Sequence, residues 1–120
     1  MKANRKDANH NLVEIYLRSL GFVTLDISAL KNCCDIVASK NGVTYLIEIK
    51  DGTKPPSQRK LTSGEKKFRD YWQSSGKWIL IKSRSDCDYL DFLVLIDNVT
   101  TEQLGAINAN IYKSLQSDNG

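Results

Sequence analysis

Apolar residues recur at helical spacing near the start of the chain and then give way to strand-like runs. Residues 7–20 carry one apolar stripe, which predicts a helix with Asp7 as its N-cap and Gly21 as its stop. The next run, residues 22–28, is rich in β-formers and predicts a strand. The stripe consists of Leu12, Val13, Tyr16, Leu17 and Leu20.

The stretch "DIVASKNGVTYLIEIK", residues 35–50, predicts a β-hairpin. Asn41-Gly42 is a favoured centre for a two-residue type I′ turn. If the turn is counted outward residue by residue, Asp35 faces Glu48 at the open end of the hairpin. The two predicted strands are 35–39 and 43–50.

Three charged side chains would then converge on one face of this hairpin. Lys50 lies two residues beyond Glu48, so strand alternation places both on the face that Asp35 shares. Directly opposed like charges are destabilising, but a bound divalent cation reverses the sign of the acid–acid interaction. Oxygen ligands of this kind suit Mg²⁺ or Mn²⁺. The alternative is a frayed strand end at which the three charges simply pair with one another.

The second half of the chain alternates helix and strand after a proline-containing loop. The sequence "TSGE" is a capping box, with Thr62 as N-cap and Glu65 at the third helical position, and predicts a helix over about 63–75. The apolar run 77–82 predicts a strand covered on both faces. A further helix is predicted from about Ser85.

An amphipathic segment at about 100–115 predicts a last helix, which is a candidate dimer element or packs on the core. The whole is therefore a mixed sheet flanked by helices, in the α/β class. We expect one domain over residues 1–120, with its core at about 7–93. The apolar positions of the last segment are Leu104, Ile107, Ile111 and Leu115.

Composition indicates an ordinary globular protein of the cytoplasm. Apolar residues make up 41% of the chain and charged residues 26%. The apolar runs are too short to cross a bilayer, and "MKANRKDANHN" has no signal-peptide core. The three cysteines, with His10, lack the paired spacing of a zinc site, so we interpret them as reduced, packed thiols. The cysteines are Cys33, Cys34 and Cys87.

Charge is unevenly distributed along the chain. Residues 50–69 contain seven basic residues and two acids, whereas residues 85–120 contain six acids and one lysine. The basic segment indicates a surface facing a polyanion, and the alternative is a solvated face. Trp72 and Trp78 are interpreted as core residues, with base stacking as the alternative.

Asp35, then twelve residues, then Glu48-Ile49-Lys50, resembles the PD-(D/E)XK nuclease superfamily. The order helix, three strands, helix, strand is also similar to the core of that superfamily. The segment "CCDIVASKNGVTYLIEIKDGTKPPSQRKLTSGEKKFRDYW" resembles small phage-type VRR-Nuc and Holliday-junction-resolvase-like proteins, which share its E-x-K strand, Asp-Gly, Lys-Pro-Pro loop and "KLT" helix start. The resemblance implies a restriction-endonuclease-like αβββαβ core with an extra C-terminal helix.

The resemblance also implies roles for individual residues. Asp35, Glu48 and the backbone carbonyl of Ile49 would be ligands of Mg²⁺ or Mn²⁺, and Lys50 would position or activate the attacking water. Such roles agree with the chemistry of metal-assisted hydrolysis. The basic loop that follows would hold DNA phosphates. Its residues are Lys54, Gln58, Arg59 and Lys60.

The chain departs from the family pattern at two places. Cys34 stands where the family usually has proline before the aspartate, which makes the placement of Asp35 less certain. The first helix of the family often supplies a further acid, and Leu12 occupies that place here. Glu14 is the candidate replacement, although a solvated helix residue is the favoured interpretation. We interpret His10 as a surface or capping side chain.

The sequence therefore predicts a metal-dependent DNA endonuclease. We expect it to prefer branched or otherwise structured DNA, such as a Holliday junction, and to act as a homodimer. We expect it in the cytoplasm, or in the host cytoplasm if the chain is phage-encoded. The alternative is a catalytically inactive DNA- or protein-binding module on the same scaffold.

Overall fold

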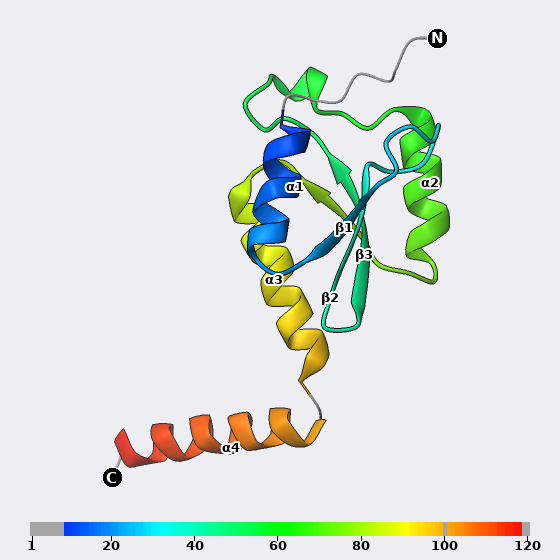
Figure 1. The fold of residues 1–120 in the computed structure, drawn as a ribbon. Helices are drawn as coiled ribbons and strands as arrows, with labels where there is room; N and C mark the ends of the chain where they lie inside the picture. Colours follow the sequence, from blue (N-terminus) through cyan, green and yellow to red (C-terminus); the bar gives the residue numbers. More distant parts are fainter. Residues whose placement is uncertain (1–8, 100, 119–120) are drawn as a thin grey trace.

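A four-stranded sheet separates two layers of helices in the computed structural model, which describes residues 9–99 and 101–118 (Figure 1). Helices α1 and α3 lie over one face of the sheet, and α2 lies over the other. The predicted order of helices and strands is confirmed. The elements are α1 (His10–Ser19), β1 (Val23–Asp26), β2 (Ile36–Lys40), β3 (Val43–Ile49), the 3₁₀ turn η1 (Pro56–Gln58), α2 (Ser63–Gln73), β4 (Trp78–Ile81), α3 (Arg84–Asn98) and α4 (Thr101–Asp118).

The hairpin of β2 and β3 has the predicted turn and register. Asn41 and Gly42 have positive φ angles of 52° and 79°, as a type I′ turn requires. The strands pair from Lys40 and Val43 at the turn to Ile36 and Ile47 at the open end.

The regular ladder stops one pair short of the predicted pairing of Asp35 with Glu48. The N–H of Asp35 donates to the carbonyl of Ile47 at 2.9 Å, and Ile47 is already the partner of Ile36. Asp35 and Ile36 thus both face Ile47 of β3, which is the arrangement of a β-bulge. The bulge re-aims the Asp35 side chain relative to a regular strand.

The sheet order brings the ends of several strands together at one end of the sheet. Strands β1, β2 and β3 are antiparallel neighbours, and β4 pairs parallel with β3 after the α2 crossover. The carboxyl ends of β3 and β4 therefore lie beside the start of β2. Helices α2 and α3 contact β4 from the two faces of the sheet, as predicted, but only Ile81 is fully buried and the other three residues are half-buried. The reason is that β4 is an edge strand.

The core lies between the sheet and the α1–α3 layer. Helix α1 contributes Val13 and Leu17, while Leu12 is 67% exposed, so the predicted stripe is wrong at that position. His10 is 1% exposed rather than on the surface, because it lies on the same helical face as Val13 and Leu17. The helix begins at His10, and the predicted N-cap Asp7 lies outside the described residues.

The cysteines behave as packed thiols. Cys34 and Cys87 are buried and all three cysteines are free of disulfides. Burial raises the pKa of each buried thiol to about 12, so both stay protonated at neutral pH.

Helix α4 runs away from the sheet and its two helical layers (Figure 1). Its apolar residues Ile107, Ile111 and Leu115 are 48%, 54% and 59% exposed, so the predicted helix forms without packing on the core. None of the helices within the described residues has the length and apolar character needed to cross a membrane.

Candidate active site

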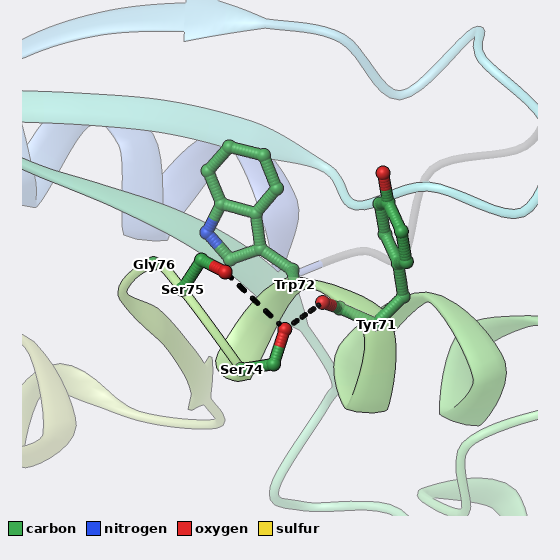
Figure 2. Close-up of a pocket in the computed structure, with 5 residues that line it drawn as sticks. All are labelled: Tyr71, Trp72, Ser74, Ser75 and Gly76. Carbon is green, nitrogen blue, oxygen red and sulfur yellow. Dashed lines mark hydrogen bonds between the residues drawn. The ribbon is translucent and has the colours of Figure 1, made fainter.

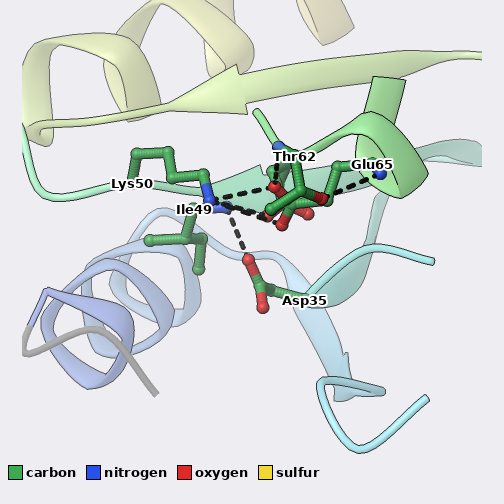
Figure 3. A network of polar contacts seen from close by, with 6 residues as sticks. Asp35, Ile49, Lys50, Thr62 and Glu65 are labelled. Atoms are coloured by element: carbon green, nitrogen blue, oxygen red, sulfur yellow. Dashed lines mark hydrogen bonds and ion pairs between the residues drawn. The ribbon is translucent and has the colours of Figure 1, made fainter. Parts of the chain in front are cut away.

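The start of β2, the end of β3 and the start of α2 meet at the open end of the hairpin (Figure 3). Asp35 is held there on both sides of its backbone. Its N–H donates to Ile47, and its carbonyl accepts from the N–H of Ile27 at 2.9 Å. Its side-chain Oδ2 accepts from the N–H of Ile49 at 2.7 Å. These bonds place the carboxylate even though Cys34, rather than proline, precedes it.

Lys50 lies between two glutamates on the α2 face of the sheet. Its Nζ is 3.7 Å from Oε1 of Glu48 and 3.1 Å from Oε1 of Glu65. The side chains of Glu48 and Lys50 are only 4% and 14% exposed. The predicted grouping of Glu48 with Lys50 is therefore present, and Glu65 joins it.

Glu65 is the residue that the sequence placed only as a helix cap. The predicted capping box is confirmed: Thr62 Oγ1 accepts from the N–H of Glu65, and Glu65 Oε1 accepts from the N–H of Thr62 at 2.8 Å. The same carboxylate also accepts two hydrogen bonds from Lys50, at 3.1 and 3.3 Å. The capping box was the one sequence signal for its position, since it fixes the carboxylate at the start of the crossover helix.

Glu48 and Glu65 have pKa values that are shifted in opposite directions. Burial raises the pKa of Glu48 to about 10, and its hydrogen bond with Glu65 and the charge of Asp35 act in the same direction. Burial opposes ionisation of Glu65 too, but hydrogen bonds from Glu48, Thr62 and Lys50 lower its pKa to about 2. Glu48 is therefore the more easily protonated of the two glutamates.

Asp35 is also destabilised as an anion. Burial raises the pKa of Asp35, although the hydrogen bond from Ile49 and the nearby His10 and Lys50 act against that rise. Burial thus makes both Asp35 and Glu48 resist ionisation, and the nearby positive charge does not offset it. Their oxygens fit a hard divalent cation, because such an ion would replace the proton and stabilise both anions.

The predicted basic loop starts directly after Lys50. Asp51 Oδ1 accepts from both the N–H and the hydroxyl of Thr53, and η1 follows, so the loop has ordered turns. Lys54 and Arg59 are half-buried, while Gln58 and Lys60 are exposed.

Arg59 is the loop residue whose side chain reaches into a groove. It lines a groove together with Gly52, Thr53, Lys82 and Ser83. Within the described residues, its buried Nε makes no hydrogen bond. A guanidinium in such a groove is suited to a phosphate group.

Asn9 joins the first helix to this edge of the sheet. Its Nδ2 donates to the carbonyl of Lys50 at 3.1 Å and to that of Lys82 at 2.9 Å. The N-terminal end of α1 is thereby tied to the ends of β3 and β4.

Glu14, the predicted first-helix acid, contacts a different set of side chains from those around Lys50. Its Oε1 is 3.3 Å from Nη2 of Arg18, and its side chain is 12% exposed. It also faces His10 and Asp26.

A small pocket occupies the opposite end of α2 from Glu65 (Figure 2). Trp72, on its wall, is 38% exposed, so its interpretation as a core residue is wrong. Its ring stacks near Phe68 with centroids 6.2 Å apart, and its N–H donates to the carbonyl of Lys77. Its place at the far end of the helix separates it from the carboxylate cluster.

Comparison with known proteins bears on the fold. No protein-family model matches the sequence, and no curated protein matches it significantly. A solved structure described as VRR_NUC domain aligns with 70% of this chain and 95% of its own length, with a TM-score of 0.51 and 16% identity. The fold is VRR_NUC-like. This likeness confirms the predicted α/β, restriction-endonuclease-like core, and at such identity it concerns the fold alone.

The raised pKa of Glu48 predicts a pH dependence of stability in metal-free buffer. The pKa of Glu48 is raised from 4.5 to about 10, so the folded state binds more protons than the unfolded state between these values. The free energy of unfolding should therefore fall as pH rises through this window. Glu48→Gln should remove the fall and be more stable than wild type by roughly 1–3 kcal/mol near pH 9.

Urea unfolding in EDTA at several pH values checks this prediction. Asp97→Asn is a matched control, because its carboxylate pairs with Lys77 at the surface and should leave the fall intact. A wild-type stability that is flat between about pH 6 and pH 9 would contradict it.

Proposed function

We propose that the protein is a metal-dependent DNA endonuclease that hydrolyses phosphodiester bonds. The observation that carries the proposal is the convergence of Asp35, Glu48 and Lys50 at one edge of a VRR_NUC-like sheet. Glu48 is buried and Asp35 is half-buried, and the charge of Asp35 adds to burial in raising the pKa of Glu48. That arrangement is costly for folding alone and is useful for holding a cation.

The proposed metal ligands are Asp35, Glu48 and the backbone carbonyl of Ile49. Mg²⁺ or Mn²⁺ bound there would supply Lewis-acid polarisation of the phosphate and a water of lowered pKa. The N–H of Ile49 holds one oxygen of Asp35, which orients this carboxylate.

Lys50 is the proposed catalytic cation. Its ammonium would orient the attacking water and stabilise negative charge that develops on the phosphate oxygens. Glu65 holds this ammonium by two hydrogen bonds and so acts as a positioning residue. Glu14 keeps its place as a proposed accessory acid only on the resemblance of α1 to the first helix of such nucleases.

The proposed substrate is DNA, with branched or otherwise structured forms preferred. Phosphates would lie along the loop that leads from the cluster, where Lys54, Arg59 and Lys60 supply positive charge and Gln58 a polar side chain. The preference for branched DNA, such as Holliday junctions, and a phage-type origin rest on the sequence resemblance.

We also propose a homodimer, because cutting two strands symmetrically needs two active sites. Helix α4 offers a surface for the second copy: Ile107, Ile111 and Leu115 recur on one side and are about half exposed. The helix lies away from the core of its own chain (Figure 1).

Cleavage assays test the enzymatic proposal against a binding module on the same scaffold. Labelled junction, flap and linear DNA are incubated with Mg²⁺ or Mn²⁺. Asp35→Ala and Lys50→Ala should each lower the cleavage rate about 100-fold or more, in the range of a lost catalytic group. Lys77→Ala should cleave normally, because Lys77 pairs with Asp97 at the surface. DNA binding without cleavage by the wild type in both metals would favour the binding module.

The loop should determine the salt dependence of DNA binding. In an Asp35→Ala background, Lys54→Ala, Arg59→Ala and Lys60→Ala should each reduce the slope of log Kd against log salt by about 1, because each removes one phosphate contact. Fluorescence anisotropy measures this slope. Lys113→Ala, on α4, is the control, and an equal reduction in that variant would remove the loop from the interface.

Light scattering after size exclusion tests the dimer. The wild type should have twice the mass of one chain, and Ile107→Glu with Ile111→Glu should have the mass of a single chain. Ala109→Glu places the same charge on the other side of α4 and should remain dimeric. A monomeric wild type, or a double variant that stays dimeric, would exclude this interface.

A further inference from the structure

A second group of metal-ligating side chains lies between α1 and β1. His10 and Glu14 are four residues apart on α1 and so lie on one helical face, and Asp26 ends β1. One ligand atom from each residue lies within 4.8 Å of the other two. None of the steps assigned to Asp35, Glu48 and Lys50 uses this group.

Neighbouring residues hold each carboxylate of the group in place. Glu14 Oε1 is 3.3 Å from Nη2 of Arg18, and Arg18 is fixed in turn because its Nε donates to Thr24 Oγ1 at 2.8 Å. Asp26 Oδ1 accepts from the N–H and the hydroxyl of Ser28, at 2.9 and 2.6 Å. Such supporting contacts are typical around metal ligands, because they orient the carboxylates.

The atoms directed into the group include buried ones that lack a hydrogen-bond partner. Within residues 9–99 and 101–118, neither Nε2 of His10 nor Oε2 of Glu14 makes a hydrogen bond. His10 is 1% exposed, and its Nε2 is 3.5 Å from Oδ2 of Asp26. Buried polar atoms nearly always have a partner, so the unpaired Nε2 of His10 and Oε2 of Glu14 point to a bound ligand.

We propose that His10, Glu14 and Asp26 form a second cation site, selective for a transition-metal ion such as Zn²⁺ over Mg²⁺. An imidazole nitrogen with two carboxylates is a donor set that Zn²⁺ prefers and Mg²⁺ does not. Tetrahedral ligands about 2.1 Å from Zn²⁺ are roughly 3.4 Å apart, which agrees with the 3.5 Å between His10 and Asp26.

The second site would lie beside the candidate active site without sharing its proposed metal ligands, and only Glu14 belongs to both proposals. Asp26 pairs with Ile36 in the β1–β2 ladder, and the N–H of Ile27 donates to the carbonyl of Asp35. A cation bound by two residues of α1 and one of β1 would fix both elements against the strand that begins after Asp35. The inference does not depend on the proposed nuclease activity.

The experiment uses the side-chain nitrogen resonances of His10, which is the single histidine of the chain. A tag-free, ¹⁵N-labelled full chain carries Asp35→Asn and Glu48→Gln, so that the candidate active site is disabled. One equivalent of Zn²⁺ should move the Nε2 resonance to the position of a metal-bound nitrogen, and excess Mg²⁺ should leave it unmoved.

Conservative variants assign the other two ligands. Asp26→Asn and Glu14→Gln should each weaken Zn²⁺ binding at least about tenfold, as loss of a ligand does. Asp97→Asn should bind Zn²⁺ unchanged. Circular dichroism establishes that each variant is folded.

An unmoved Nε2 resonance in excess Zn²⁺ would overturn the second site, as would Zn²⁺ binding that survives both carboxylate changes. Equal responses to Mg²⁺ and Zn²⁺ would overturn its selectivity. Cleavage of DNA by a protein that fails this test would leave the proposed function standing. Zn²⁺ binding by a protein that cleaves no DNA would leave the second site standing and contradict the proposed function.

Discussion

The contact of Lys50 with Glu65 holds the functional edge of the molecule together. Lys50 follows β3, and Glu65 begins α2, the helix that crosses over so that β4 can pair with β3. The same Glu65 oxygen lies 3.1 Å from Lys50 Nζ and 2.8 Å from the N–H of Thr62, so one carboxylate both caps α2 and ties it to the sheet. Removing either partner would leave a largely buried charge without compensation.

Around this contact the protein collects more negative groups than it can neutralise. Asp35 and Glu48 both have raised pKa values, first because they are buried and then because acids surround them. The backbone N–H of Ile49 and the ammonium of Lys50 relieve only part of the cost. A site of this kind gains stability from a bound cation, since any ligand that binds only the folded state stabilises it. Stability and the proposed catalysis thus depend on the same shortage of positive charge.

Sequence reasoning worked where local geometry decides the outcome. The Asn41-Gly42 turn determined the hairpin register because a two-residue turn leaves no freedom in the pairing. The predicted register failed one residue beyond Ile36, at Asp35. The bulge there comes from contacts with β1 and β3 that no local pattern encodes. Even so, Asp35 and Glu48 lie near each other, because the antiparallel and parallel pairings bring the ends of these strands to the same end of the sheet.

The first helix shows a different limit. Apolar patterning placed Leu12 inside and His10 outside, because it treats histidine as polar and leucine as core-forming. The helix instead turns His10 inward with Val13 and Leu17. Glu65 was overlooked for a related reason: its role as a cap explained the residue fully in sequence terms, and its reach to Lys50 depends on the crossover.

The most direct measurement is the side-chain ¹³C carboxyl resonance of Glu48, followed by NMR with and without Mg²⁺. If the cluster is a cation site, Glu48 should remain protonated well above neutral pH in EDTA, with its pKa raised toward about 10. At fixed neutral pH, Mg²⁺ should then displace that proton and move the resonance to the carboxylate position. A Glu48 that ionises near its ordinary pKa and ignores Mg²⁺ would contradict the account.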